Sequence, residues 1–290
     1  MDRIYKQIKT AFAASLLAVI PIISAHAVVM AEPLVEPAFY GPNALPVPDM
    51  IDGTADKSIR IEAGYDYIAG HAGDITHNIN LYANIPLFTD RVHLRLFVPP
   101  VIEFWEHTNS SLSLYNLSED SKKGNVGGDI YVATDIHVLK EECHKVNVVA
   151  TAMIKSASGD GSEHLRYFDV PAYHFYGTVS KTLHLKSSIV SGINFAGMIG
   201  FSCWQIEAHR QNDAILYGLQ VSANGEHYNL SVNARGIHGR LHQGDAPSVI
   251  KARLDLKLGN WSPFVSYQHG LNDHPFNFYS IGLLYSMPLK

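Results

Sequence analysis

Residues 250–258 alternate between apolar or small side chains and charged ones, in the order Ile-Lys-Ala-Arg-Leu-Asp-Leu-Lys-Leu. Successive side chains of a β-strand point to opposite faces, so this segment would have one apolar face and one charged face. The same alternation recurs about a dozen times along the chain. A chain built from such strands must fold so that the two faces of one sheet meet two different environments.

The beginning of the chain has the features of a secretory signal. Three basic residues precede an apolar run over 11–24, and the small-x-small sequence Ala-His-Ala follows at 25–27. The run is short for a membrane-spanning helix, although a membrane anchor is the alternative. We therefore expect residues 1–27 to be a signal peptide.

The composition fits an exported β-protein better than a nucleic-acid-binding one. Net charge is −5, and it becomes −7 once the signal, with one acidic and three basic residues, is removed. An acidic chain gives no reason to expect a nucleic-acid partner. Charged residues make up 17% of the chain, below the roughly 25% of soluble domains, while 15 Tyr and 12 Phe favour strands and membrane interfaces.

Residues 28–56 differ from the rest of the chain because five prolines recur there without strand or helix periodicity. We expect this segment to be an extended, partly mobile leader in the periplasm. A plug that enters the barrel is the alternative interpretation. The strands occupy the remaining domain, residues 57–290.

The alternating segments predict twelve strands, separated by turn residues such as Asn224-Gly225 and Gly259-Asn260. The connections alternate between short turns and longer loops, which is typical of outer-membrane barrels with short periplasmic turns. An even strand number returns both barrel ends to the periplasm. The predicted strands are 58–69, 74–86, 91–104, 128–139, 145–156, 171–182, 185–199, 213–223, 227–237, 248–258, 261–269 and 276–287.

The fold class is therefore all-β, an antiparallel transmembrane β-barrel in the outer membrane, expected to be a monomer in contact with lipid. A soluble secreted β-protein is the alternative, but twelve strands would enclose more space than inward apolar side chains fill. In the membrane barrel the apolar faces meet lipid, where a charge costs about 2–4 kcal/mol at the midplane. The last strand, 276–287, would be read by the outer-membrane insertion machinery, although the chain ends on Lys290 rather than on an aromatic residue.

The inward faces carry the residues predicted to line a pore. Charged walls select solutes by field and size, and the alternative is that these charges pair across a narrow lumen and fill it. Inward aromatics that could stack on flat solutes are Tyr82, Phe97, Tyr131, Tyr176 and Phe264. The predicted pore-lining residues are Arg60, Glu62, Asp66, Arg95, Asp129, Tyr131, Asp135, His137, Lys155, Arg235, Lys251, Arg253 and Asp255, with Arg95, Arg253, Asp129 and Asp135 at the narrowest part.

Three functions are compatible with this pattern. The first is a passive, porin-like channel for small polar solutes. The second is a plugged structural or surface-binding barrel that acts through loops 105–127, 157–170 and 200–212, which carry Trp105, Tyr115, Tyr167, Phe168 and Trp204. The third is a lipid-modifying enzyme, but outward Ser and His positions do not fall on neighbouring strands. No catalytic residue, metal ligand or cofactor is therefore predicted.

The two cysteines, Cys143 and Cys203, would lie at opposite ends of such a barrel. A disulfide needs α-carbons within about 7 Å. We therefore expect two free thiols.

With strands and loops laid out, three stretches give the chain a family likeness: 128–141, 210–214 and 264–270. On these the chain resembles Gram-negative outer-membrane β-barrels of the Bacteroidetes kind. Its size and strand number are also similar to nucleoside-channel-like barrels and to the transporter-like barrels of phenol-degradation pathways. The resemblance implies the fold, the outer-membrane location and solute passage, and it places no binding residue.

Overall fold

The structure is a computed structural model that describes residues 43, 45–54, 56–160, 164, 166, 171–187, 189–206, 210–240 and 244–289. The predicted signal peptide, most of the leader, and the loop residues Tyr167 and Phe168 lie outside the described residues.

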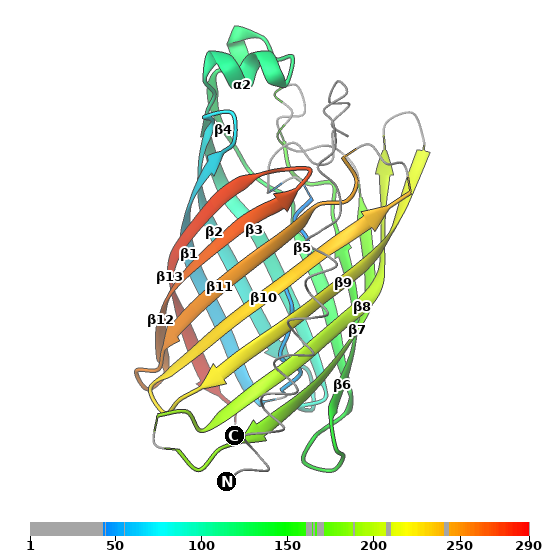
Figure 1. The fold of residues 1–290 in the computed structure, drawn as a ribbon, viewed down its shortest axis with the longest axis vertical. Helices are drawn as coiled ribbons and strands as arrows, with labels where there is room; N and C mark the ends of the chain where they lie inside the picture. Colours follow the sequence, from blue (N-terminus) through cyan, green and yellow to red (C-terminus); the bar gives the residue numbers. More distant parts are fainter. Residues whose placement is uncertain are drawn as a thin grey trace. The chain divides into compact units, whose positions relative to one another are not determined.

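Antiparallel strands close into a barrel of twelve (Figure 1). Neighbours in sequence pair in space, β1 pairs with the last strand, β13, and β2 pairs with β3, which completes the ring. The four-residue β4 pairs only with the end of β3. The strands are β1 (Ser58–Gly70), β2 (Ile75–Pro86), β3 (Val92–Glu106), β4 (Lys123–Val126), β5 (Tyr131–Leu139), β6 (Asn147–Lys155), β7 (Ala172–His184), β8 (Gly192–Ile206), β9 (Arg210–Asn224), β10 (Tyr228–Gly239), β11 (Ser248–Leu256), β12 (Trp261–Asn272) and β13 (Phe276–Pro288).

The predicted barrel class and its twelve wall strands are confirmed, but one strand was placed wrongly. The segment 185–199 was predicted as a strand, whereas β8 begins only at Gly192. Residues 185–191 form a turn that the Leu185 amide closes on the Ser191 carbonyl, at 2.8 Å. The sequence Leu-Lys-Ser-Ser-Ile-Val-Ser at 185–191 does not alternate between polar and apolar residues, so the predicted strand was extended beyond its periodic part.

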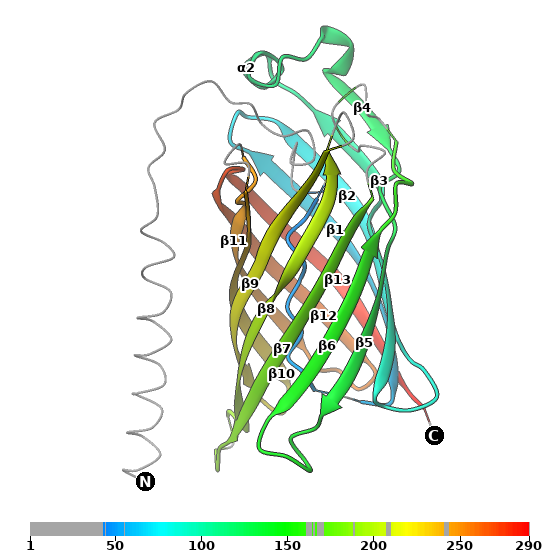
Figure 2. The same ribbon diagram turned by 90° about the vertical axis from the view of Figure 1, so that its right-hand side faces the viewer.

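The two ends of the barrel differ, as the loop lengths predicted. Both barrel termini lie at the end with the short turns, where Ser58 pairs with Pro288. The opposite end carries the 107–130 connection with helix α2 (Asn109–Leu114), the 3-10 helix η2 (Glu119–Ser121) and β4 (Figure 2). Short turns mark the periplasmic end of an outer-membrane barrel, so α2 lies on the extracellular side.

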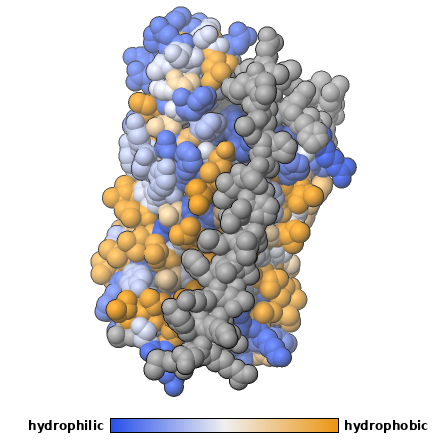
Figure 3. All heavy atoms as spheres, viewed as in Figure 1, coloured by the Kyte–Doolittle hydropathy of each residue, from blue (hydrophilic) through white to orange (hydrophobic). Residues whose placement is uncertain are grey.

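The outer wall is apolar around the barrel. Ile281 on the closing strand is 59% exposed, and Ile199 on the far side of the ring is 71% exposed. Apolar side chains gather over the strands and hydrophilic ones over the loop end (Figure 3). Such a surface is stable only in contact with lipid.

The free thiols lie at opposite ends: Cys143 is in the turn between β5 and β6, and Cys203 is near the extracellular end of β8. In the described part of the chain, no helix is long and apolar enough to span a membrane.

The described part of the leader runs inside the barrel (Figures 1 and 2). We call residues 45–54 the lumen strap. Val47 is 6% exposed, and a Cβ built on Gly53 would lie 2.5 Å from the Ser180 hydroxyl oxygen on the inner face of β7. The leader was predicted to lie in the periplasm, and the structure instead places this part against the inner wall. Its buried apolar side chains explain the position, because they leave water there.

Candidate functional site: the barrel lumen

The lumen holds a cavity of about 940 Å³, bordered by strand residues from every side and by the lumen strap. Its lining is mainly polar, which follows from the alternation that sends apolar residues to lipid. Of the thirteen residues predicted to line a pore, eleven border this cavity: Arg60, Glu62, Asp66, Arg95, Tyr131, Asp135, His137, Arg235, Lys251, Arg253 and Asp255.

The other two, Asp129 and Lys155, do not border the cavity. Their side chains are 0% and 1% exposed and form an ion pair at 2.5 Å. The Asp129 carboxylate also accepts the backbone amides of Ser158 and Gly159 at 2.9 and 2.7 Å. This arrangement anchors the 156–160 connection to the wall, so we assign Asp129 a structural role rather than a place at a constriction.

A second buried network joins β3, β5, β6 and β7. The Arg95 guanidinium donates to both Asp135 carboxylate oxygens, at 2.5 and 2.9 Å, and to the Tyr176 hydroxyl at 2.9 Å. The Thr151 hydroxyl donates to the same carboxylate at 2.6 Å. Arg95 and Asp135 are 5% and 2% exposed. The two charges compensate each other and fix four strands in register.

A third network compensates Arg253 on β11. Its guanidinium donates to both oxygens of Glu62 at 3.1 and 2.8 Å, and to Asp255 at 2.7 Å. The guanidinium also lies 3.8 Å from the centre of the Phe264 ring, within reach of a cation–π contact. Two carboxylates and one guanidinium leave this part of the wall with a surplus of negative charge.

The lumen strap supplies the partner for two further cations. Arg235 on β10 and Lys251 on β11, which we call the cation pair, bind the Asp49 carboxylate at 2.5 and 3.0 Å. Arg235 also donates to the Val47 carbonyl at 3.3 Å. Asp49 thus attaches the strap by charge to the wall of the polar cavity.

Beyond Asp49, towards the extracellular end, the inner wall becomes apolar. Leu45 and Val47 of the lumen strap pack into a cluster of buried wall residues, which we call the apolar cluster. These side chains fill the lumen where polar residues were expected. The wall members are Ile68, Ala172, Tyr176, Met198, Trp204, Ala214, Leu216, Ile237, Val249 and Phe276.

A group of polar side chains lies at the extracellular end of the lumen. The Asn43 amide donates to Glu103 at 2.6 Å, and the Arg166 guanidinium pairs with the same carboxylate. Arg166 also donates to the Thr76 hydroxyl at 3.0 Å and lies 5.6 Å from the centre of the Trp105 ring. Since Glu103 is 0% exposed, Arg166 and Asn43 provide the partners of a buried carboxylate.

A Ser–His contact at the mouth has the residue types of a hydrolase but not the geometry. His107 Nδ1 lies 3.0 Å from the Ser111 hydroxyl. Ser111 is 0% exposed, and its hydroxyl donates to the Thr108 carbonyl at the start of α2. Burial, with the nearby Arg166 guanidinium, lowers the pKa of His107 to about 4. Ser111 thus lies in the first turn of α2 beside a neutral imidazole, buried away from any substrate, and Thr108 is the N-cap.

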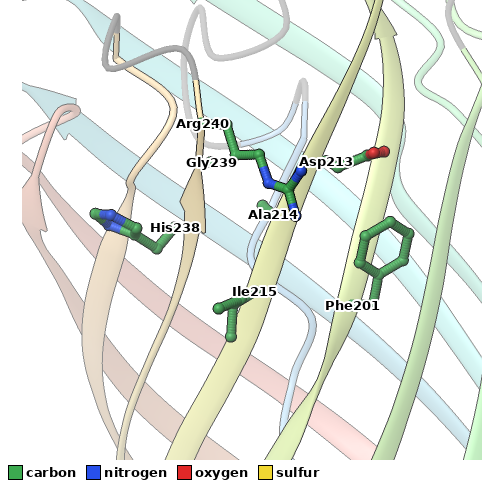
Figure 4. A pocket seen from close by; sticks show the side chains of 7 residues that line it. All are labelled: Phe201, Asp213, Ala214, Ile215, His238, Gly239 and Arg240. Atoms are coloured by element: carbon green, nitrogen blue, oxygen red, sulfur yellow. The ribbon is translucent and has the colours of Figure 1, made fainter.

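A small hollow of about 230 Å³ lies on the outer wall near the extracellular rim (Figure 4). Phe201 and Ile215 form its lower part, and the Arg240 side chain extends over β9 towards Asp213. No serine or cysteine is among the described residues that line it. Among the described residues, no group of three His, Cys, Asp or Glu side chains is placed to hold a metal ion.

Sequence reasoning missed the apolar cluster and misplaced two aromatic residues. Trp105 and Trp204 were predicted in loops, but they lie in β3 and β8 and are 4% and 0% exposed. The available signal was that 192–206 and 214–219 are apolar at both odd and even positions. A strand with two apolar faces needs a second apolar partner, which here is the lumen strap.

No family model matches the sequence, and no curated protein matches it. Among solved structures, an outer-membrane channel from Pseudomonas putida F1 aligns over 83% of this chain and 100% of its own, with a TM-score of 0.53 and 11% identity. The KdgM porin in complex with disordered oligogalacturonate aligns over 79% of this chain and 99% of its own, with a TM-score of 0.49 and 11% identity. The translocator domain of the autotransporter NalP from Neisseria meningitidis aligns over 79% of this chain and 87% of its own, with a TM-score of 0.42 and 10% identity.

At these identities the likeness shows the fold alone. The closed twelve-stranded ring, the lipid-facing apolar wall and the mainly polar cavity define an outer-membrane β-barrel, and the chain is located in the outer membrane. Its fold is that of barrels that include porins and channels, as the sequence predicted.

Proposed function

We propose that the protein is a channel that passes small polar solutes across the outer membrane, and that the lumen strap restricts its bore. The supporting observation is the cavity of about 940 Å³ bordered by the lumen strap and by strand residues on all sides of the barrel. A barrel that served only as a filled scaffold would need no such space, because small barrels fill their interior with side chains.

The wall charges support a channel in which inner charges are paired, the alternative that the sequence left open. Arg95 with Asp135, and Arg253 with Glu62, are bound to each other rather than free in water. These pairs act as part of a rigid wall. The variable part of the bore is therefore the segment between the cation pair and the mouth, where Leu45 and Val47 lie.

Planar-bilayer conductance tests the proposal on the refolded full-length chain. We define the strap variant as Leu45→Ser with Val47→Ser and Asp49→Asn. The wild type is expected to conduct in small or brief steps, and the strap variant in steps several-fold larger. Asp52→Asn is the matched control, because the Asp52 carboxylate bonds to Thr54 of the strap itself. Absence of steps in both wild type and strap variant at every salt concentration would exclude a channel.

The second candidate is a plugged barrel that binds a partner through its extracellular loops. The observations that favour it are the packing of Leu45 and Val47 into the apolar cluster and the buried Glu103–Arg166 pair at the extracellular end. Deleting residues 109–121 separates the two. A channel lacking this segment still conducts, with altered step size, whereas a loop binder loses its partner.

A further inference from the structure

The cation pair takes its acidic partner from the lumen strap rather than from the barrel wall. Arg95, Arg253 and Lys155 each have an acidic partner on the barrel wall or its connections. Within the described residues, the only carboxylate at ion-pair distance from Arg235 and Lys251 is Asp49. Without the strap, Arg235 and Lys251 have no carboxylate at ion-pair distance among the described residues.

The cation pair is also built to hold an anion in one place. Arg235 is 4% exposed, and its guanidinium donates to Asn233 at 2.7 Å and to Gln268 at 2.9 Å. These bonds orient the remaining donors towards the lumen. Taking two like charges out of water is costly unless an opposite charge meets them. A carboxylate between Arg235 and Lys251 satisfies that requirement, and Asp49 supplies it here.

The wall next to the cation pair is apolar. The segment Leu45-Pro46-Val47-Pro48-Asp49 places two apolar side chains in the apolar cluster and its carboxylate on the cation pair. An extended chain of five residues spans at most about 16–18 Å. The wall therefore accommodates an elongated body that is apolar along its length and carries one negative charge at the end nearer the periplasm.

We infer that this wall is a binding site for amphipathic carboxylates, which the lumen strap occupies as an internal ligand. A solute with an apolar body and one carboxylate competes with Leu45, Val47 and Asp49 for the same contacts. The inference names a solute class for the proposed channel. Passage of such a solute rests on the proposed function, whereas its binding to the wall does not.

Calorimetric titration of the refolded protein in micelles tests the site without any conductance. The probes are 3-phenylpropionate, its neutral analogue 3-phenylpropanol, and acetate. The strap variant is expected to bind 3-phenylpropionate at least 10-fold more tightly than the wild type or Asp52→Asn. The alcohol should bind at least 10-fold more weakly than the acid because it lacks the carboxylate. Acetate should bind more weakly still because it lacks the apolar body.

A wall substitution on top of the strap variant separates the site from general adsorption. Adding Lys251→Gln is expected to reduce affinity for 3-phenylpropionate about 10-fold and to leave the affinity for 3-phenylpropanol unchanged. Should the strap variant not fold, Asp49→Asn alone tests the same site, with an expected gain of about 3-fold over Asp52→Asn.

Equal affinity of wild type and strap variant, equal binding of acid and alcohol, or indifference to Lys251→Gln would each overturn the inference. A strap variant that conducts but does not bind the acid selectively refutes the site and leaves the channel. A strap variant that binds the acid selectively but never conducts refutes the channel and leaves the site.

Discussion

At the scale of single residues, the carboxylate of Glu141 in the β5–β6 turn binds residues at the end of β7. It accepts the backbone amide of Thr182 at 2.9 Å and forms an ion pair with Lys181. Its own backbone amide donates to the Asn147 side chain at 2.7 Å. The β5–β6 turn is thereby tied to the end of β7 at the periplasmic rim.

This clamp predicts a pH-dependent contribution to stability. Burial would raise the pKa of Glu141, but the hydrogen bonds from Lys181 and Thr182 outweigh it and hold the pKa below its usual range. A depressed folded-state pKa stabilises the protein above the unfolded pKa of about 4.3, and that contribution is lost as pH falls through the folded value. We expect Glu141→Gln to lower the free energy of unfolding by about 1 kcal/mol at pH 7, with the difference vanishing in strong acid.

Urea titrations of both proteins at pH 7 and at pH 3 measure that difference. Glu142→Gln is the control, since Glu142 lies exposed in the same turn. A constant difference between wild type and Glu141→Gln at both pH values would contradict the role assigned to the carboxylate.

The Arg95–Asp135 pair makes a second residue-scale prediction. Removing one partner leaves a charge on the inner wall without its counter-ion, which costs roughly 3–5 kcal/mol in a dry core. Because this pair borders the cavity, we expect Asp135→Asn to cost about 2–3 kcal/mol. The double variant Arg95→Met with Asp135→Leu should cost less than Asp135→Asn alone in the same denaturation assay. A double variant less stable than the single one would show that the pair stabilises the wall beyond charge compensation.

At the scale of elements, alternation predicted nearly every strand because lipid and lumen impose opposite demands on successive residues. From the sequence alone, the alternation assigned Val232 to the lipid side and Arg253 to the lumen side. It failed at the start of β8, because the predicted strand included residues 185–191, where a period of two is absent. It also could not place the lumen strap, since proline-rich segments carry no period and Leu45 finds its wall partners only after the ring has closed.

The two faces of β10 give a test at this scale. Val232 is 43% exposed on the lipid face, while the neighbouring inward residue Asn229 pairs in register with Asp255. Lysine on the lipid face costs about 2–4 kcal/mol near the midplane. We expect Val232→Lys to lower stability by that amount in lipid vesicles and Asn229→Lys to be close to neutral. Equal losses would mean that the assignment of the faces is wrong.

At the scale of the barrel as a whole, the wall and the lumen strap form one structure. The wall contributes the cation pair and most of the apolar cluster, and the strap contributes the charge and apolar volume that complete them. The cation pair of the wall needs the carboxylate of the strap, and the apolar side chains of the strap need the wall. A change in the wall that never touches a pore charge should therefore alter the bore through the position of the lumen strap.

Gly218 on β9 allows that coupling to be tested. A Cβ built there would lie 2.8 Å from the Met50 sulfur of the lumen strap and 3.0 Å from the Arg235 Cβ. Overpacking of this kind typically costs about 1–3 kcal/mol, and here the movable side is the strap. We expect Gly218→Val to displace the strap and to raise single-channel conductance several-fold, with a modest loss of stability.

A compensating substitution identifies the cause. Met50→Ala removes the side chain that the new valine meets, so Gly218→Val with Met50→Ala should return conductance towards the wild-type level, a non-additive result expected of residues in contact. Gly197→Ala is the control for adding a methyl group to the wall, because its nearest neighbour, the Leu219 side chain, is 3.7 Å away. If Gly218→Val raises conductance equally with and without the Met50→Ala substitution, the strap does not set the bore, and the restriction must lie with the mouth residues Glu103 and Arg166.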